Sequence, residues 1–118
     1  MPHFIVKPDR DRDEYVEWST IVDAPVDVGT RSELGGRLGN AGGSDRFDRA
    51  DASGSSARGD VQGWFGWDDE WFHLGNFHWD GFAWEWRVHR SNLAAYARAD
   101  LDGDEDAARS LAEHVERA

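Results

Sequence analysis

Two stretches near the start of the chain are predicted to be β-strands, the first because it is rich in β-forming residues and the second because hydrophobic and polar residues alternate along it. The first stretch runs from His3 to Lys7 and is closed by Pro8 and a run of charged residues. The second runs from Glu14 to Val22 and places Val16, Trp18, Thr20 and Val22 on one side and Tyr15, Glu17, Ser19 and Ile21 on the other. Because successive side chains of a strand point to opposite faces, this stretch is predicted as a strand that Pro25 ends.

A short helix is predicted over residues 30–38. Thr30 and Glu33 have the spacing of a capping box, in which a hydroxyl and a carboxylate satisfy backbone amide groups at the start of a helix. Two glycines inside this segment each disfavour the helix by up to ~1 kcal/mol relative to alanine, so its stability should depend on tertiary packing. The chain then reads as a glycine-rich loop over 39–45, a weak strand over 46–52 and a turn over 53–56.

Two turn signals divide the next segment, which is rich in aromatic residues, into three short antiparallel strands. The signals are the pairs Gly75-Asn76 and Asp80-Gly81, which suit two-residue hairpin loops. The resulting register predicts a core face made of Phe72, Leu74, Phe77, Trp79, Phe82, Trp84, Trp86 and Val88. The opposite face would carry Trp71, His73, His78, Ala83, Glu85, Arg87 and His89.

Two further helices are predicted near the end of the chain. Ser91 is placed to cap a helix over about residues 92–101, and Asp104 is placed to cap a last helix that reaches about residue 117. Together the elements predict a single α+β domain over residues 1–118, with one antiparallel sheet of about five or six strands. The predicted helices, 30–38, 92–101 and 104–117, would all cover one face of that sheet.

The length of the chain and its lack of cysteine limit the kinds of protein it can be. A chain of 118 residues fits one domain, and without cysteine it has no disulfide, thiol nucleophile or cysteine zinc site. No apolar run approaches the ~18 residues of a membrane helix, and the start of the chain lacks the features of a secretion signal. We therefore expect a cytoplasmic protein that does not bind membranes.

The chain is strongly acidic. The 24 Asp and Glu residues against 13 Lys and Arg residues give a formal net charge of −11. This charge repels nucleic acids and anionic membranes, so direct binding of DNA or RNA is disfavoured. An acidic surface also keeps a protein soluble, which explains the charge without any specific function.

Six of the seven tryptophans lie in the stretch from Trp64 to Trp86, and the seventh is Trp18. Large rigid indoles beside carboxylates are typical of protein-binding hot spots, because they bury much area at little entropic cost. The indoles outside the predicted core register, together with the carboxylates between them, form the predicted partner-binding site: Trp64, Trp67, Asp68, Asp69, Glu70 and Trp71. Each of these indoles could instead belong to the core, and the three carboxylates could form a hairpin turn.

A metal site is the main alternative for this segment. In the predicted register His73 and His78 lie opposite each other and Glu85 lies diagonal to His78, a ligand set that could hold zinc or ferrous iron. A change of one residue in either turn removes this grouping, and exposed sheet residues are the simpler interpretation. The prediction is therefore no metal and no cofactor.

Two other patterns suggest chemistry only superficially. The acidic run over residues 100–106 resembles the start of a calcium loop, but Glu105 and Leu111 stand where such a loop needs glycine and a bidentate glutamate. A helix-capping turn is the favoured interpretation. The sequence also has no nucleophile elbow and no serine with a histidine nearby in sequence, so no catalytic residue is predicted.

Several blocks of the chain resemble small acidic proteins of high-GC actinobacteria and their phages. The blocks are residues 15–20 through 23–25, 29–31, 49–56, 66–70 and 93–97, which together span most of the chain. The resemblance implies a GC-rich bacterial or phage origin and a cytoplasmic location. The group has no assigned activity, so no functional residue is carried over from it.

The function predicted from the sequence is a non-enzymatic protein-protein interaction module of the inhibitor, immunity or regulatory-accessory type. Its acidic, tryptophan-rich surface would bind a partner protein, plausibly a basic one. One alternative is a nucleic-acid mimic that inhibits a DNA- or RNA-binding protein, although interspersed arginines break up the required negative field. The other is a small metal-dependent enzyme that uses the His and Glu cluster. The sequence does not predict an oligomeric state.

Overall fold

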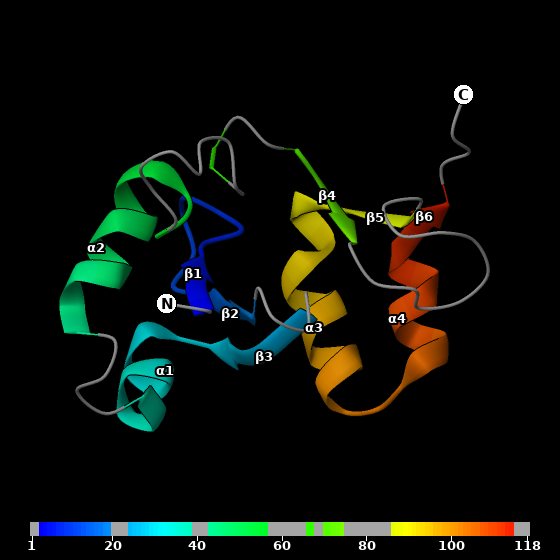
Figure 1. The fold of residues 1–118 in the computed structure, drawn as a ribbon, viewed down its shortest axis with the longest axis horizontal. Coiled ribbons are helices and arrows are strands. Elements are labelled where there is room, and N and C mark those ends of the chain that lie inside the picture. The colour runs from blue at the N-terminus through cyan, green and yellow to red at the C-terminus, as the bar shows by residue number, and fades with distance from the viewer. Residues whose placement is uncertain are drawn as a thin grey trace.

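The computed structural model describes residues 3–19, 24–38, 43–56, 66–67, 70–74 and 86–114. The elements in order are β1 (His3–Val6), β2 (Tyr15–Ser19), β3 (Ala24–Gly29), α1 (Arg31–Leu38), α2 (Gly43–Ser53), β4 (Trp71–Leu74), β5 (Trp86–His89), the short 3₁₀ helix η1 (Arg90–Asn92), α3 (Leu93–Leu101), α4 (Glu105–Leu111) and β6 (Ala112–His114). Figure 1 shows α1 and α2 at one end of the molecule and α3 and α4 at the other, with β1, β2 and β3 between them. The α+β class is thus confirmed.

The strands form two three-stranded antiparallel sheets, so the prediction of one sheet of five or six strands is wrong. The first sheet has the order β1-β2-β3 and the second the order β4-β5-β6. The sequence analysis missed β3 because Pro25 was taken as the end of a strand. Pro25 instead lies in β3 opposite Trp18, where the register shifts. A proline is tolerated there because β3 is an edge strand of the first sheet.

Helices cover both faces of the first sheet, which corrects the prediction that they all lie on one face. Every residue of β2 is buried, and its alternating side chains enter two different clusters. The main core joins Val16 and Trp18 to side chains of α3 and of the second sheet. The smaller cluster joins Ile5 and Tyr15 to the helices on the other side through Leu34, Phe47 and Ala50. The second sheet therefore shares its core with the first.

The predicted strand over residues 46–52 is wrong, because α2 occupies this part of the chain. Phe47 and Ala50 are one helical turn apart and are both buried against the first sheet. The helix begins at Gly43, inside the predicted glycine-rich loop. Few residues of α2 are apolar, so the packing of one buried stripe, and not local propensity, determines its helical state.

The predicted start of α1 is confirmed in detail. The Thr30 amide donates to Glu33 Oε1 at 2.8 Å, and the Glu33 amide donates to Thr30 Oγ1 at 3.1 Å. These reciprocal bonds are those of a capping box. At the other end of the chain, Asp104 accepts from the Ala107 amide at 3.1 Å and caps α4 as predicted.

The second sheet is assembled differently from the predicted meander. β5 pairs directly with both β4 and β6, so β4 and β5 are neighbours in the sheet, whereas the meander placed a middle strand between them. The predicted last helix ends at Leu111, and Ala112–His114 become β6 instead of continuing α4. Backbone pairing along β5 provides these residues with the hydrogen bonds that a longer helix would have given them. The predicted middle strand, which contains Phe77 and Trp79, lies outside the described residues.

The predicted division of this sheet into two faces nevertheless holds for the residues that the structure describes. Phe72 pairs with Val88 and Leu74 pairs with Trp86, and all four lie in or against the main core. Phe72, Leu74 and Val88 are fully buried. Their neighbours along the strands are more exposed and lie on the opposite side, which we call the outer face.

The turn before α3 is capped by a different residue from the one predicted. Ser91 was expected to cap this helix, but the N-cap of η1 is His89, whose Nδ1 accepts from the Ser91 amide at 3.2 Å. Between α3 and α4, Gly103 adopts a left-handed φ of 76°, which suits the tight turn. The acidic run at this turn thus has a capping role, as the sequence analysis favoured.

Candidate functional site

The outer face of the second sheet carries five described side chains: Trp71, His73, Arg87, His89 and Glu113. Strand pairing fixes this grouping, because paired residues of an antiparallel sheet share a face. His73 and Glu113 are exposed, and the other three are half-buried. Leu93 and Tyr96 of α3 pack in the core on the opposite side. The outer face is therefore the polar and aromatic side of this sheet.

Arg87 links all three strands of the outer face. Its guanidinium carbon lies 3.8 Å from the centroid of the Trp71 ring on β4. Its Nε and Nη2 donate to Glu113 Oε2 on β6 at 3.2 and 3.1 Å. The ring of His89 meets Trp71 edge-on, with the centroids 4.8 Å apart. Trp71 thus lies in a fixed orientation with a cation stacked on one face of its ring.

Trp67, the other described indole of the predicted site, is tied to the end of α2. Its amide donates to Ser53 O at 2.8 Å, and its Nε1 donates to Ala52 O at 3.1 Å. The guanidinium carbons of Arg10 and Arg90 lie 4.8 and 4.7 Å from the ring centroid. Since its indole N–H is already bonded within the chain, Trp67 supports the fold directly.

Glu70 is exposed, immediately before β4, and its backbone carbonyl accepts from the Arg90 amide at 2.7 Å. Of the six residues of the predicted partner-binding site, Trp67, Glu70 and Trp71 are therefore placed, with Trp71 on the outer face. Trp64, Asp68 and Asp69 lie outside the described residues. Their part in a contact stays a prediction.

The sequence analysis missed Arg90, which is the most connected polar side chain of this region. It is 9% exposed, and its guanidinium donates to four backbone carbonyls, those of Lys7, Pro8, Gly54 and Gly66. Three of these distances are 2.9 Å to Pro8, 2.7 Å to Lys7 and 3.3 Å to Gly54. We call this arrangement the Arg90 clamp.

The Arg90 clamp joins segments that are remote in sequence. It holds the chain after β1, the chain after α2 and the chain before Trp67 against the start of η1. The guanidinium carbon also lies 4.7 Å from the Trp67 ring centroid and 5.5 Å from that of Phe72. The clamp therefore positions the segment that leads into β4 and the outer face.

The proposed metal ligands are only partly described. His73 is exposed on the outer face, and its strand partner is Arg87 of β5. His78 and Glu85 lie outside the described part of the chain, so their predicted grouping with His73 stays a prediction. Among the residues that are described, no group of three or more His, Asp and Glu side chains is arranged to hold a metal ion.

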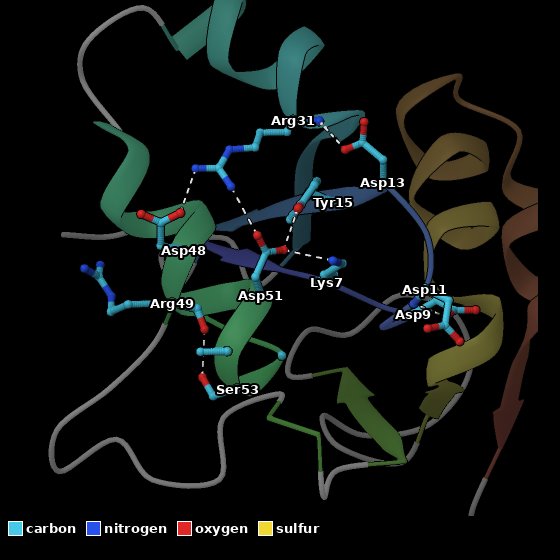
Figure 2. Close-up of polar contacts among 12 residues, drawn as sticks. Lys7, Asp9, Asp11, Asp13, Tyr15, Arg31, Asp48, Arg49, Asp51 and Ser53 are labelled. Atoms are coloured by element: carbon cyan, nitrogen blue, oxygen red, sulfur yellow. Dashed lines mark hydrogen bonds and ion pairs between the residues drawn. The ribbon is translucent and has the colours of Figure 1, made fainter.

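A second polar cluster lies at the other end of the molecule, centred on Asp51 of α2. Asp51 Oδ1 accepts from Lys7 Nζ at 2.9 Å and from the Tyr15 hydroxyl at 2.6 Å. Its Oδ2 accepts from Arg31 Nη1 at 3.1 Å, and Arg31 Nη2 also donates to Asp48 Oδ1 at 2.8 Å. Figure 2 shows these side chains converging from β2, α1, α2 and the residue that follows β1. The Asp51 cluster thus binds both N-terminal helices to the first sheet.

The pKa values of this cluster fit a structural role. Burial, together with the hydrogen bond to Asp51, raises the pKa of Tyr15 to about 12. Burial also raises the pKa of Asp51, but the hydrogen bonds from Tyr15 and Lys7 and the nearby cations outweigh it and lower that pKa below its ordinary value. At neutral pH, Asp51 is therefore ionised and Tyr15 is protonated. Neither group exchanges a proton in the range where a general acid or base works.

A titration tests this cluster. The hydrogen bond from neutral Tyr15 stabilises the fold below the ordinary tyrosine pKa of 10.0, and its contribution is lost as the pH rises through about 12. In a Tyr96→Phe variant, which leaves Tyr15 as the remaining tyrosine, the absorbance of the phenolate should rise with a midpoint at about 12 in the folded protein. The same variant unfolded in urea provides the control. A folded-state midpoint near that of the unfolded chain would contradict the assigned hydrogen bond.

Comparison of the chain with protein-family models, with curated proteins and with solved structures gave no match. The resemblance to actinobacterial and phage proteins therefore stays a prediction. Of the helices in the described ranges, none has the length and apolar character needed to cross a membrane.

Proposed function

We propose that this protein is a non-enzymatic protein-protein interaction module that binds its partner through the outer face of the second sheet. The observation that carries the proposal is the Trp71 indole, which is half-buried on the face turned away from the core and fixed by Arg87 and His89. Tryptophan and arginine are the residues most enriched in binding hot spots. Because the pairing of β4 with β5 and the edge-on contact with His89 already orient Trp71, little side-chain entropy is lost when a partner covers it.

The charge of the chain supports a basic partner. A formal net charge of −11 accelerates the encounter with a positively charged surface and disfavours acidic partners. Glu70 and Glu113 are exposed; Glu70 directly precedes Trp71 in the sequence, and Glu113 lies on the outer face, where it pairs with Arg87. Attraction would therefore come from the carboxylates and affinity from the indole.

The proposed contact includes the residues predicted from the sequence, but it gives them different roles. Trp71 and Glu70 make the contact, and Glu113 of the outer face contributes a further carboxylate. Trp67, whose indole N–H is bonded to Ala52 O, supports the segment that carries them. Trp64, Asp68 and Asp69 remain part of the proposed contact by their position in the sequence.

The outer face also bears on the two alternatives. A nucleic-acid mimic needs carboxylates along one continuous face. Among the described residues, the outer face instead combines a tryptophan, two histidines and an arginine with Glu113. General acid–base catalysis uses a group whose pKa lies near the working pH, and the shifted pKa values of Tyr15 and Asp51 lie far from neutral, so the Asp51 cluster does not supply such a group. These observations favour a protein-binding role.

Affinity capture from the native cell tests the proposal. Wild-type protein and a Trp71→Leu variant would be immobilised and exposed to lysate at low and high salt. We expect a basic partner that is retained at low salt by the wild type, and roughly 30-fold weaker binding by the variant, since a hot-spot tryptophan contributes about 2 kcal/mol or more.

The matched control is Leu101→Ala, which removes an exposed apolar side chain at the end of α3, where Leu101 is 43% exposed. Circular dichroism would establish that both variants are folded. The proposal is contradicted if no basic protein is retained at either salt concentration. It is equally contradicted if Trp71→Leu retains the partner as well as Leu101→Ala does.

A further inference from the structure

The ring face of Trp71 already holds a cation. The Arg87 guanidinium lies 3.8 Å from the ring centroid, and it also donates two hydrogen bonds to one carboxylate oxygen of Glu113. Trp71 and Glu113 therefore form a site with an aromatic face and a carboxylate, and this site is filled by a guanidinium of the chain itself. We call Trp71 and Glu113 the guanidinium site.

The occupant of the guanidinium site is exchangeable. The side chains of Arg87 and Glu113 are 26% and 52% exposed, so both ends of the ion pair are open to solvent. Ion pairs and cation–π contacts at such exposed positions are individually weak and are screened by salt. A stacking distance of 3.8 Å leaves no space for a further group between the ring and Arg87. Any partner group that stacks on this ring face must therefore displace Arg87.

We infer that an arginine side chain of a basic partner protein takes the place of Arg87 in the guanidinium site when the complex forms. This inference rests on the function proposed above, and it names the chemistry of the contact. A planar guanidinium stacks on an indole and hydrogen-bonds a carboxylate at the same time, whereas a lysine ammonium is a strongly hydrated point charge. The net charge of −11 concentrates such a partner at the surface.

Arg87 is then an intramolecular competitor that lowers the affinity of the free protein. Binding is weakened by the fraction of molecules in which the site is closed. Removing the Arg87 guanidinium opens every copy of the site. The same change also makes the chain more acidic by one charge, so a control must separate competition from net charge.

The test uses two short dye-labelled peptides, one alternating arginine with glycine and one alternating lysine with glycine. Their binding is followed by fluorescence anisotropy at low salt. The variants are Arg87→Gln and, as the charge-matched control, Arg98→Gln. Arg98 is half-exposed on α3 and pairs with Glu14 at 2.7 Å, away from the outer face.

We expect Arg87→Gln to bind the arginine peptide about fivefold more tightly than Arg98→Gln does, as the loss of one exposed cation–π contact implies. The lysine peptide should bind both variants alike. Adding Trp71→Leu to Arg87→Gln should abolish the gain, and Arg87→Lys should show a smaller gain. Circular dichroism of each variant would verify the fold.

Three results would overturn the inference: equal affinity of Arg87→Gln and Arg98→Gln for the arginine peptide, the same gain with the lysine peptide, or no peptide binding by any variant. None of these affects the proposed function if capture of a basic partner still depends on Trp71. Loss of that dependence would overturn the proposed function itself. The two ideas therefore fail in different experiments.

Discussion

Replacing Arg90 with methionine is expected to lower the free energy of unfolding by about 3–5 kcal/mol, because the backbone carbonyls that the buried guanidinium bonds would lose their donor. Methionine has a similar apolar stem but no donors. The carbonyls of Lys7, Pro8, Gly54 and Gly66 would then lose the guanidinium that they share. Each buried acceptor left without a partner costs about 1–3 kcal/mol, although water reaching the opened site would offset part of the total.

Urea unfolding followed by circular dichroism measures this change. The matched control is Arg98→Met, since Arg98 is half-exposed and forms a surface ion pair with Glu14. Its loss should cost less than about 1 kcal/mol, as for other surface pairs. If Arg90→Met and Arg98→Met differ by less than about 1 kcal/mol, the clamp does not hold the segments after β1, after α2 and before Trp67 together as described. Arg90→Lys should lie between the wild type and methionine, because an ammonium keeps the charge but loses the planar fork.

Local patterns predicted the parts of the fold that local chemistry determines. The alternation in β2 and the capping box before α1 were both found in the sequence, as was the Asp104 cap of α4. The two faces of β4 and β5 were also predicted correctly, because they depend on the period of a strand and not on its partner. These features need no knowledge of distant residues.

The misses occur where distant contacts override local preference. Pro25 was read as a strand terminator, but an edge strand tolerates it. Residues 43–53 have a weak local preference and become α2 because Phe47 and Ala50 pack on the first sheet. Ala112–His114 continue a helical pattern, yet they pair with β5 instead. In each case a tertiary contact determined the state.

In the candidate site, too, local patterns predicted some residues correctly, whereas residues placed by distant contacts were missed. Trp71 was placed on the polar face of its strand from the alternation alone, and the structure agrees. Glu113 was missed, because the sequence analysis assigned it to a helix and so away from Arg87. Arg90 gave no signal, since its partners are backbone carbonyls between 24 and 83 residues away. A carbonyl group is present in every residue, so no pattern of side chains marks it as a partner.

Replacing Gly54 with alanine is the second large effect expected. Gly54 has a φ of 94°, a conformation that residues with a Cβ rarely adopt. A Cβ built there would lie 2.6 Å from Arg90 Nη2 and 2.9 Å from the amide nitrogen of Trp67. The Trp67 amide cannot move away without losing its bond to Ser53 O, and Arg90 cannot move without opening the clamp. Backbone strain and overpacking together should lower the free energy of unfolding by about 3 kcal/mol or more.

The chain contains a control that separates strain from crowding. Gly103 has a similar left-handed φ of 76°, but a Cβ added there would meet nothing within 4 Å. Gly103→Ala should therefore show the backbone strain alone, about 1–2 kcal/mol. The difference between the two variants measures how tightly Arg90 and Trp67 close around Gly54. If the two alanine variants are equally stable in urea, the clamp is looser than the distances indicate, and the path of the chain from α2 into Trp67 is not fixed by it.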